Sequence, residues 1–357
     1  MQTIKIMNSL FKVPLIAIVL AVGFTGICQA QIGILDVREG TGIPPVVRKI
    51  YEKGTVFLAS SQNEDGSWGE RLSATTEGVC GLCVMAFLST GEDPNFGKYA
   101  SNIRKALQHI IRTQNADTGY IPGNMYSHGF AMLALAEAYG AVDDEQLWVD
   151  EEKSEKTRTV GEALELAVRL AVTSQKKNSF DAWRYSPTQR NADTSVCGAV
   201  LMGLLAARNA GIEVPDESID KALGYMRSMT TESGEVGYSN MRGLSEPQAR
   251  SSIACLVYAI AKRTEWKEYE AVKKYVSTNF SSATKWPFYM RYYQAQALFQ
   301  SNYALWEKWN EDTIELIRNA QLEDGSIKPK QHGPAYSTSM SLLALALNYR
   351  FLPIYER

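Results

Sequence analysis

One pattern recurs six times along the chain: an amphipathic segment, a turn, and a second segment of small and apolar residues. The clearest copy runs from Lys53 through Gln62 and Gly66 to Trp68, and Gln321 opens a turn of almost the same sequence. The small and apolar segments cover 75–90, 126–139, 193–210, 250–263, 292–300 and 336–349. A repeat of about 50 residues indicates stacked helix pairs.

Helices that are apolar all round belong inside a protein, whereas helices with one charged face belong outside. The pattern therefore predicts an all-α fold, an (α/α)6 barrel of six helix pairs. The pairs span approximately 43–91, 97–140, 160–211, 216–264, 267–303 and 310–350, within a single domain of residues 31–357. An open superhelical array is the alternative. A closed ring is favoured because the last segment, 336–349, is as apolar as the middle ones. A helix exposed to water at the end of an open array should not be this apolar.

The first 30 residues have the order of a secretory signal peptide: Lys5 and Lys12, an apolar run over 13–27, and a small residue at Ala30. The run is shorter than the roughly 20 residues that span a bilayer. We therefore expect a secreted or periplasmic protein, cleaved near Ala30 and without a membrane span afterwards. Lys and Arg total 37 against 39 acidic residues, with no basic run, so nucleic acid is not an expected partner.

Residues 53–68 resemble the QW repeat of squalene-hopene and oxidosqualene cyclases, whose α/α toroid is shared with the β subunits of protein prenyltransferases. Residues 183–211 resemble a stretch of exported bacterial prenyltransferase and squalene oxidase repeat-containing proteins. The resemblance implies a terpene cyclase-like toroid. We expect the glutamines of the repeats to tie neighbouring outer helices together and so to stabilise the fold.

The catalytic motifs of these families are missing. The D-x-D-D acid of the cyclases would fall at 190–194, where only Asp193 remains, and Asp193 has an alternative role as a helix N-cap. The prenyltransferase zinc ligands would fall near Cys255 and Ser337, where the aspartate and the histidine are absent. We therefore expect no metal site and no cofactor, and whether the protein is an enzyme stays open.

The expected mature chain has four cysteines, Cys80, Cys83, Cys197 and Cys255. Cys80, Cys197 and Cys255 fall at similar points of the inner segments, where we expect them to be buried thiols that pack as small apolar groups. A disulfide between Cys197 and Cys255 is the alternative, since export permits one.

If inner and outer helices alternate in direction, the turns and the N-terminal ends of the inner helices meet at one mouth of the barrel. The candidate ligand-binding residues there are Trp68, Tyr120, Trp183, Tyr185, Tyr238, Arg250, Tyr293 and Tyr336. The candidate catalytic residues are Asp193, His128 and Glu77. Helix packing is the alternative role for each aromatic residue.

These observations predict a toroid that binds an apolar, glycan or peptide ligand in its central cavity. The expected partner is a small molecule, a lipid, a glycan, or a protein at the barrel mouth. One alternative is a divergent enzyme that uses the same cavity, either a cyclase-like isomerase or a carbohydrate hydrolase or lyase. Another is a structural envelope scaffold.

Overall fold

The computed structural model describes residues 42–69, 76–149, 154, 156–239, 244–280, 285–329 and 332–355. The predicted signal peptide, residues 1–30 with its cleavage site near Ala30, lies outside these ranges. The helices are α2 (Pro45–Ser60), α3 (Thr76–Leu88), α4 (Ala100–Thr113), α5 (Met125–Ala138), α6 (Asp144–Leu147), α7 (Val160–Lys176), α8 (Thr194–Asn209), α9 (Asp216–Ser228), α10 (Gln248–Ile260), α11 (Lys267–Asn279), α12 (Pro287–Ser301), α13 (Tyr303–Ala320) and α14 (Gly333–Leu345). Two 3-10 helices, η1 (Ala346–Asn348) and η2 (Pro353–Tyr355), follow α14.

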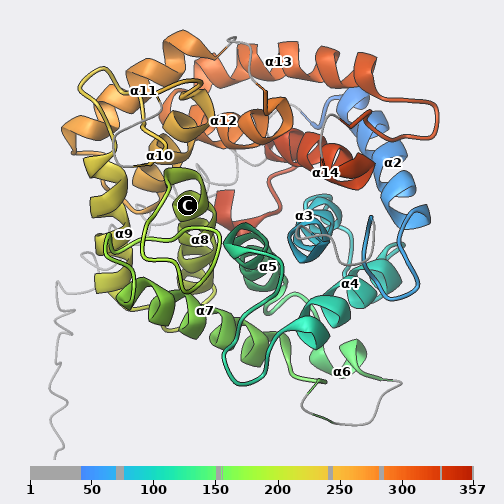
Figure 1. Cartoon of the computed structure of the whole chain (residues 1–357). Helices are drawn as coiled ribbons and strands as arrows, with labels where there is room; N and C mark the ends of the chain where they lie inside the picture. Colours follow the sequence, from blue (N-terminus) through green and yellow to red (C-terminus); the bar gives the residue numbers. More distant parts are fainter. Residues whose placement is uncertain are drawn as a thin grey trace, which may run out of the picture. The chain divides into compact units, whose positions relative to one another are not determined.

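Apart from the short α6, the helices of the unit that begins at Pro45 alternate between an outer and an inner ring (Figure 1). Outer α4 buries only one face, through residues such as Ile103 and Leu107, whereas every residue of inner α3 is buried. The described residues contain no β-strand. Isolated bridges pair Thr230 with Val236 and Gln321 with Ile327. The predicted all-α (α/α)6 barrel is confirmed.

The inner helices approach closely where glycine faces the neighbouring backbone. A Cβ atom on Gly81 of α3 would lie 2.7 Å from the carbonyl oxygen of Phe130 in α5. A Cβ atom on Gly129 of α5 would lie 2.7 Å from the carbonyl carbon of Ala199 in α8. Contacts this short exclude any larger side chain, which explains the glycines at positions 81 and 129.

Glutamine turns tie four of the six outer helices to the next one. Gln62 Nε2 donates to the Gly66 carbonyl in its own turn and to Asn102 of α4, at 3.0 Å each. The same pair of hydrogen bonds, one within the turn and one to the next outer helix, links Gln114 to Ala163 of α7, Gln175 to Ser218 of α9, and Gln321 to Ile50 of α2. These four amides satisfy backbone carbonyls at the junctions between repeats, as the sequence predicted.

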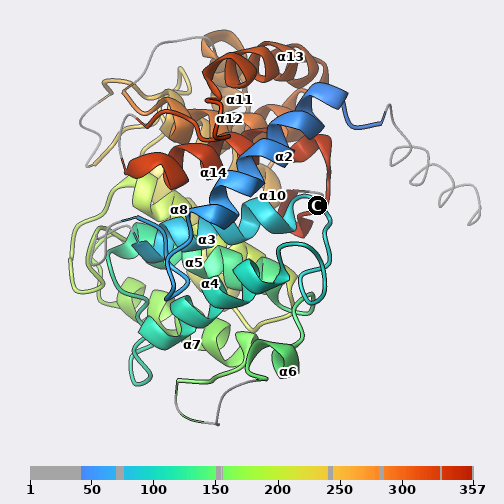
Figure 2. The same cartoon turned by 90° about the vertical axis from the view of Figure 1, so that its right-hand side faces the viewer.

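The last helix pair packs against the first and closes the ring. Tyr51 Oη of α2 donates a 2.6 Å hydrogen bond to the carbonyl of Leu342 in α14, and α14 contacts both α2 and α3. Figure 2 shows α2 beside α13 and α14. The sixth pair begins at Tyr303, earlier than the expected residue 310, because Asn302 caps α13 by accepting a hydrogen bond from Leu305 N.

The chain's C-terminal end closes the barrel at the end away from the N-termini of the inner helices. Ile354 and Tyr355 of η2 are buried, and the Tyr355 carbonyl accepts a 2.8 Å hydrogen bond from Gln300 Nε2 near the end of α12. Ile354 N lies 3.5 Å from Glu137 Oε2 near the end of α5. The open end of the barrel is therefore the one where the inner helices begin.

Candidate functional site

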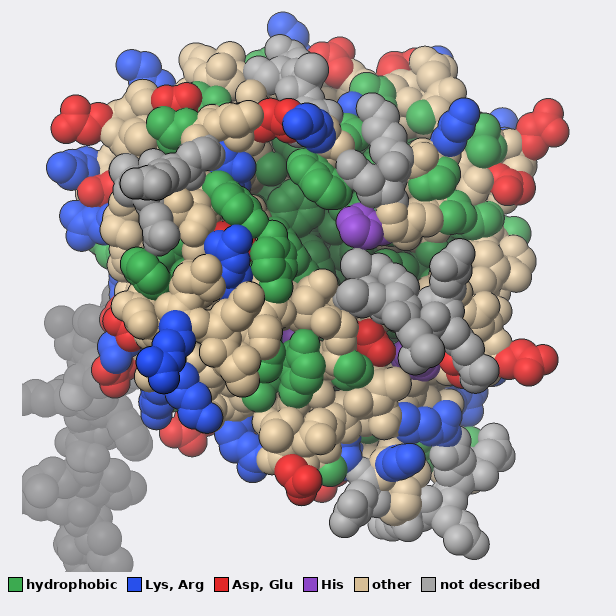
Figure 3. Space-filling model, viewed as in Figure 1, with side chains coloured by type: hydrophobic (Ala, Val, Ile, Leu, Met, Phe, Trp, Pro, Cys, Tyr) green, Lys and Arg blue, Asp and Glu red, His purple; other side chains and the backbone are tan. Residues whose placement is uncertain are grey.

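A cavity of about 520 Å³ lies where the inner helices begin. Each of the six inner helices, or the loop just before it, contributes to its wall. Figure 3 shows a hollow on this face, lined mainly by side chains of the hydrophobic class, which in this view includes tyrosine. The lining residues that carry the argument below are Val79, Leu82, Tyr126, Phe130, Tyr185, Ser195, Tyr238, Glu246, Ala249, Arg250, Lys285, Trp286, Tyr289, His332 and Tyr336.

Tyrosines from four repeats form one wall of this cavity. The ring of Tyr126 lies 6.2 Å from that of Tyr185 and 6.1 Å, edge to face, from that of Tyr289. The hydroxyl groups of Tyr185 and Tyr238 hydrogen-bond to each other, and Tyr289 Oη donates to the Ser195 carbonyl at 3.4 Å. Burial raises the pKa of Tyr126 and Tyr289, so both phenols stay protonated at physiological pH. This wall offers ring faces together with neutral hydrogen-bonding groups.

Trp286, His332 and Tyr336 form a second aromatic group. Trp286 is 45% exposed and stacks on His332 with 6.0 Å between ring centroids. His332 in turn lies edge to face with Tyr336 at 5.1 Å. Burial lowers the pKa of His332, which favours the neutral imidazole. The group places flat apolar surface beside solvent.

Charged side chains line the mouth around α10. Arg250 donates from Nε to the Val236 carbonyl at 2.9 Å and from Nη2 to the Ser245 carbonyl at 3.0 Å. Glu246 Oε2 accepts a 3.0 Å hydrogen bond from Lys285 N. Opposite this polar side, Val79, Leu82 and Phe130 form an apolar wall.

Asp193 lies behind this cavity wall and is fully buried. Its Oδ1 accepts a 2.8 Å hydrogen bond from Val196 N, which confirms the N-cap interpretation. Its Oδ2 has no hydrogen-bond partner among the described residues. Burial raises the pKa of Asp193 to about 6, against the opposing effect of the cap bond and of Arg184 and Arg250.

His128 and Glu77 do not line the cavity. Both nitrogens of the buried His128 ring face backbone groups: Ile121 N donates to Nδ1 at 3.2 Å, and Nε2 lies 3.0 Å from the Ala167 carbonyl. This arrangement fixes the neutral Nε2–H tautomer, and burial lowers the pKa of His128 to about 4. The ring therefore joins α5 to its preceding turn and to α7.

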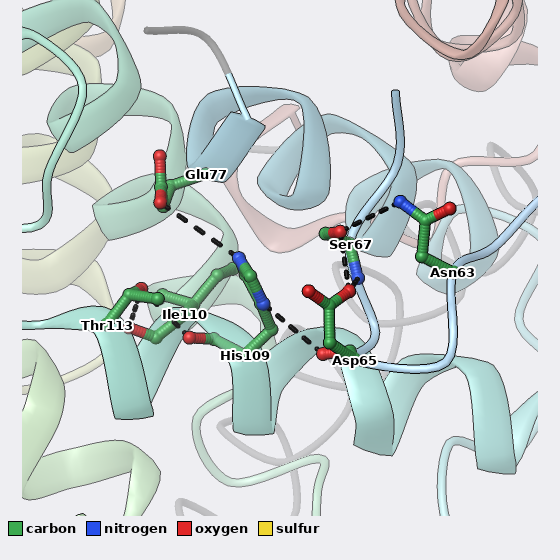
Figure 4. A network of polar contacts seen from close by, with 7 residues as sticks. All are labelled: Asn63, Asp65, Ser67, Glu77, His109, Ile110 and Thr113. Atoms are coloured by element: carbon green, nitrogen blue, oxygen red, sulfur yellow. Dashed lines mark hydrogen bonds and ion pairs between the residues drawn. The ribbon is translucent and has the colours of Figure 1, made fainter. Parts of the chain in front are cut away.

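Glu77 belongs to a polar network between α3, α4 and the first glycine turn (Figure 4). Its Oε1 lies 4.0 Å from Nε2 of His109, and Nδ1 of His109 lies 3.2 Å from the Asp65 carbonyl. Burial raises the pKa of Glu77. The structure thus does not bring Glu77, His128 and Asp193 together on the cavity surface.

Four of the eight candidate ligand-binding residues line the cavity: Tyr185, Tyr238, Arg250 and Tyr336. Trp68 and Trp183 are buried at their turns, where their Nε1 groups donate to the carbonyls of Leu58 at 2.7 Å and Ala171 at 2.9 Å. Tyr120 stacks on His128, and Tyr293 is buried beneath Tyr289 at 4.9 Å between ring centroids. None of these four is part of the lining.

The sequence reasoning missed Tyr126, which also lines the cavity. Tyr126 lies within the first turn of the inner helix α5. That position is the signal that could have found it. Apolar spacing alone hides it, because the inner segments carry no polar face that would predict the rotation of the helix.

All four described cysteines, Cys80, Cys83, Cys197 and Cys255, are buried free thiols. The described ranges contain no group of three His, Cys, Asp or Glu side chains suited to a metal ion. Within the same ranges, none of the helices combines the length and the hydrophobicity needed to cross a bilayer.

No protein-family model matches the sequence, and no curated protein matches it. Solved structures do share its fold. An α-1,6-mannanase from Salegentibacter sp. aligns with a TM-score of 0.62 and 12% identity, over 84% of this chain and 99% of that one. The type II terpene cyclase MstE from Scytonema aligns with a TM-score of 0.56 and 15% identity, over 87% of this chain and all of that one.

A protein from Actinoplanes aligns with a TM-score of 0.56 and 13% identity, over 85% of this chain and 99% of that chain. At these identities the similarity concerns the fold. The chain has an α/α toroid fold of the kind found in the terpene cyclase, as the QW-like repeats predicted.

Proposed function

We propose that the protein binds a small organic ligand in its central cavity, with the ligand's apolar part against Val79, Leu82 and Phe130. The observation that carries the proposal is the cavity itself: about 520 Å³, within the usual range for ligand pockets, with a wall drawn from all six helix pairs. A scaffold whose barrel served only to hold protein contacts would have no need of it. We further propose that the protein is exported by its signal peptide as one domain.

An apolar or ring-shaped ligand suits this lining best. The tyrosine wall and the stacked pair of Trp286 and His332 offer ring faces, and the charged mouth is confined to one side. Two structures of similar fold contain such molecules. One is an inactive variant of the mannanase in complex with alpha-1,6-mannotriose, and the other is a variant of MstE in complex with geranylgeranyl dihydroxybenzoate.

A second candidate is an enzyme of the same cavity that uses Asp193. The observation that favours it is the buried carboxyl with a free Oδ2 and a pKa of about 6, a value suited to proton transfer. A carbohydrate hydrolase would use two carboxylates at the sugar. Glu246 is the single carboxylate among the described lining residues, so the geometry favours binding over hydrolysis.

Binding of N-phenyl-1-naphthylamine, an uncharged apolar dye, tests the proposal. We expect its fluorescence to rise with the wild-type protein and with Ala304→Trp, which adds a tryptophan on the exposed side of α13. Ala249→Trp adds the same side chain inside the cavity lining and should abolish the rise. Equal dye binding by Ala249→Trp and Ala304→Trp would contradict a cavity site, as would no binding by the wild type.

Native mass spectrometry of the purified protein, before and after extraction with organic solvent, identifies the natural ligand. We expect a bound mass that extraction removes and that the Ala249→Trp variant lacks. A co-purified isoprenoid would reject the glycan and scaffold alternatives together, and a bound oligosaccharide would reject the isoprenoid.

A further inference from the structure

We propose that Asp193 is a positioning residue for the cavity mouth. Its carboxylate holds Arg184 and Arg250 against the rim tyrosines Tyr185 and Tyr238, so that ligand binding weakens when the carboxylate takes up a proton. The inference rests on the proposed ligand-binding function and adds its regulation by pH.

The start of α8 anchors both rim tyrosines. Asp193 N donates to the Trp183 carbonyl at 3.1 Å, two residues before Tyr185. Thr194 N donates to the Tyr238 carbonyl at 3.0 Å, and Thr194 Oγ1 donates to the Gly237 carbonyl at 2.7 Å. The turn that contains Asp193 therefore holds the loops before α8 and before α10 side by side.

Two arginines cover the same tyrosines. The guanidinium of Arg184 lies 5.3 Å from the ring centroid of Tyr185 and 5.6 Å from that of Tyr238. The guanidinium of Arg250 lies 5.9 Å from the ring of Tyr238. Both arginines favour the ionised form of Asp193, so the carboxylate attracts each of them from behind the rim.

Only one oxygen of Asp193 is used by the helix. Oδ1 caps Val196 N, whereas Oδ2 is buried without a hydrogen-bond partner among the described residues. Protonation at Oδ2 therefore leaves the cap in place and removes the negative charge. The arginines then keep only their ring contacts and their hydrogen bonds to other groups, such as that of Arg184 Nη1 to Ser239 Oγ at 3.2 Å.

The titratable and charged groups that interact with Asp193 come from four helices and from the loops before two of them: Tyr126 of α5, Arg184 before α8, Cys197 of α8, Tyr225 of α9, Tyr238 before α10 and Arg250 of α10. Burial raises the pKa of the tyrosines and of the cysteine, so they stay neutral between pH 5 and 7. The arginines stay protonated over that range. Because burial raises the pKa of Asp193 to about 6, this carboxyl is the member of the set that changes charge there.

The test compares wild type, Asp193→Asn and Asp117→Asn. Asparagine keeps the size and the capping oxygen at position 193 and removes the charge. Asp117 is an exposed aspartate in the second turn and serves as the matched control. Each protein carries 3-fluorotyrosine at position 185, and its fluorine NMR shift is followed without ligand from pH 5 to 7.5. The affinity for N-phenyl-1-naphthylamine is measured over the same range.

We expect the wild-type and Asp117→Asn resonances to shift with a midpoint near pH 6, together with a loss of dye affinity of about fivefold or more toward pH 5. Asp193→Asn should show neither change. A titration of the same size in Asp193→Asn, or a pH-independent wild-type affinity, overturns the inference while dye binding still supports the proposed function. If the wild-type resonance titrates but the dye binds at no pH, the proposed ligand binding and its regulation by Asp193 are both overturned.

Discussion

The side-chain amide of Gln321 joins the last outer helix to the first, because its Nε2 donates a 3.0 Å hydrogen bond to the carbonyl of Ile50. The same nitrogen donates to the Gly325 carbonyl within its own turn, also at 3.0 Å. One side chain thus fixes the final turn and closes a ring between residues 271 positions apart. Gln62 performs the equivalent task between α2 and α4.

We expect Gln321→Ala to lower the free energy of unfolding by about 1–3 kcal/mol, because two carbonyl groups lose their donor. Urea unfolding followed by circular dichroism measures the change. Glu323→Ala, at an exposed position of the same turn, should leave stability within about 0.5 kcal/mol of wild type. Equal stability of the two variants would show that the ring closes without this amide.

Gly325 is expected to tolerate no side chain. Its φ is +88°, and a Cβ atom would lie 2.2 Å from the Lys53 carbonyl oxygen of α2. Gly211 has a similar φ of +94° with open space around it, so Gly211→Ala measures the backbone strain alone. We expect about 1–2 kcal/mol of destabilisation for Gly211→Ala and about 1–3 kcal/mol more for Gly325→Ala. If urea unfolding shows equal losses of stability for Gly211→Ala and Gly325→Ala, α2 moves aside without a cost in free energy, which contradicts the prediction.

Asp193 and His128 should affect the pH dependence of stability in opposite directions. The folded-state pKa of Asp193 is raised to about 6, so its contribution to stability is largest below its ordinary pKa of 3.8 and is lost as pH rises through 6. The pKa of His128 is lowered from 6.5 to about 4, so its contribution is present above pH 6.5 and is lost as pH falls toward 4. In the wild type the two effects largely cancel.

Asp193→Asn removes one of these effects. We expect the stability of Asp193→Asn relative to wild type to increase by about 3 kcal/mol between pH 4 and pH 7.5, because each unit of pKa shift corresponds to about 1.4 kcal/mol. His128→Gln should move the other way over the same interval. Urea unfolding at pH 4, 5, 6 and 7.5 measures both. Curves parallel to that of the wild type would contradict the assigned pKa directions.

The four described cysteines should resist alkylation in the folded protein. Each is buried, and burial raises the pKa of each thiol, so the reactive thiolate is scarce. We expect iodoacetamide to label Cys80, Cys83, Cys197 and Cys255 only after denaturation, as mapped by peptide mass spectrometry. A peptide in which Cys197 is joined to Cys255 would contradict the free-thiol arrangement.

The repeat pattern alone was enough to predict the architecture. Repeated pairs of an amphipathic segment and an apolar segment can bury their apolar surface only if the second helix of each pair lies inside the first. The glutamines at the turns predicted the links between outer helices. Each lies at a helix end, where backbone carbonyl groups lack a hydrogen-bond donor within the helix. The capping role of Asp193 also followed from local order, since an N-cap depends only on residues within one turn.

Which aromatic residues face the cavity depends on packing between distant parts of the chain. Trp183 and Tyr185 lie two residues apart in one turn, yet Trp183 bonds to the end of α7 while Tyr185 lines the mouth. Inner helices that are apolar all round carry no sequence signal for their rotation, so Tyr126 joins the wall while His128 faces away from it. That rotation is set by close contacts between helices, such as Gly129 against Ala199, which come from residues distant in sequence.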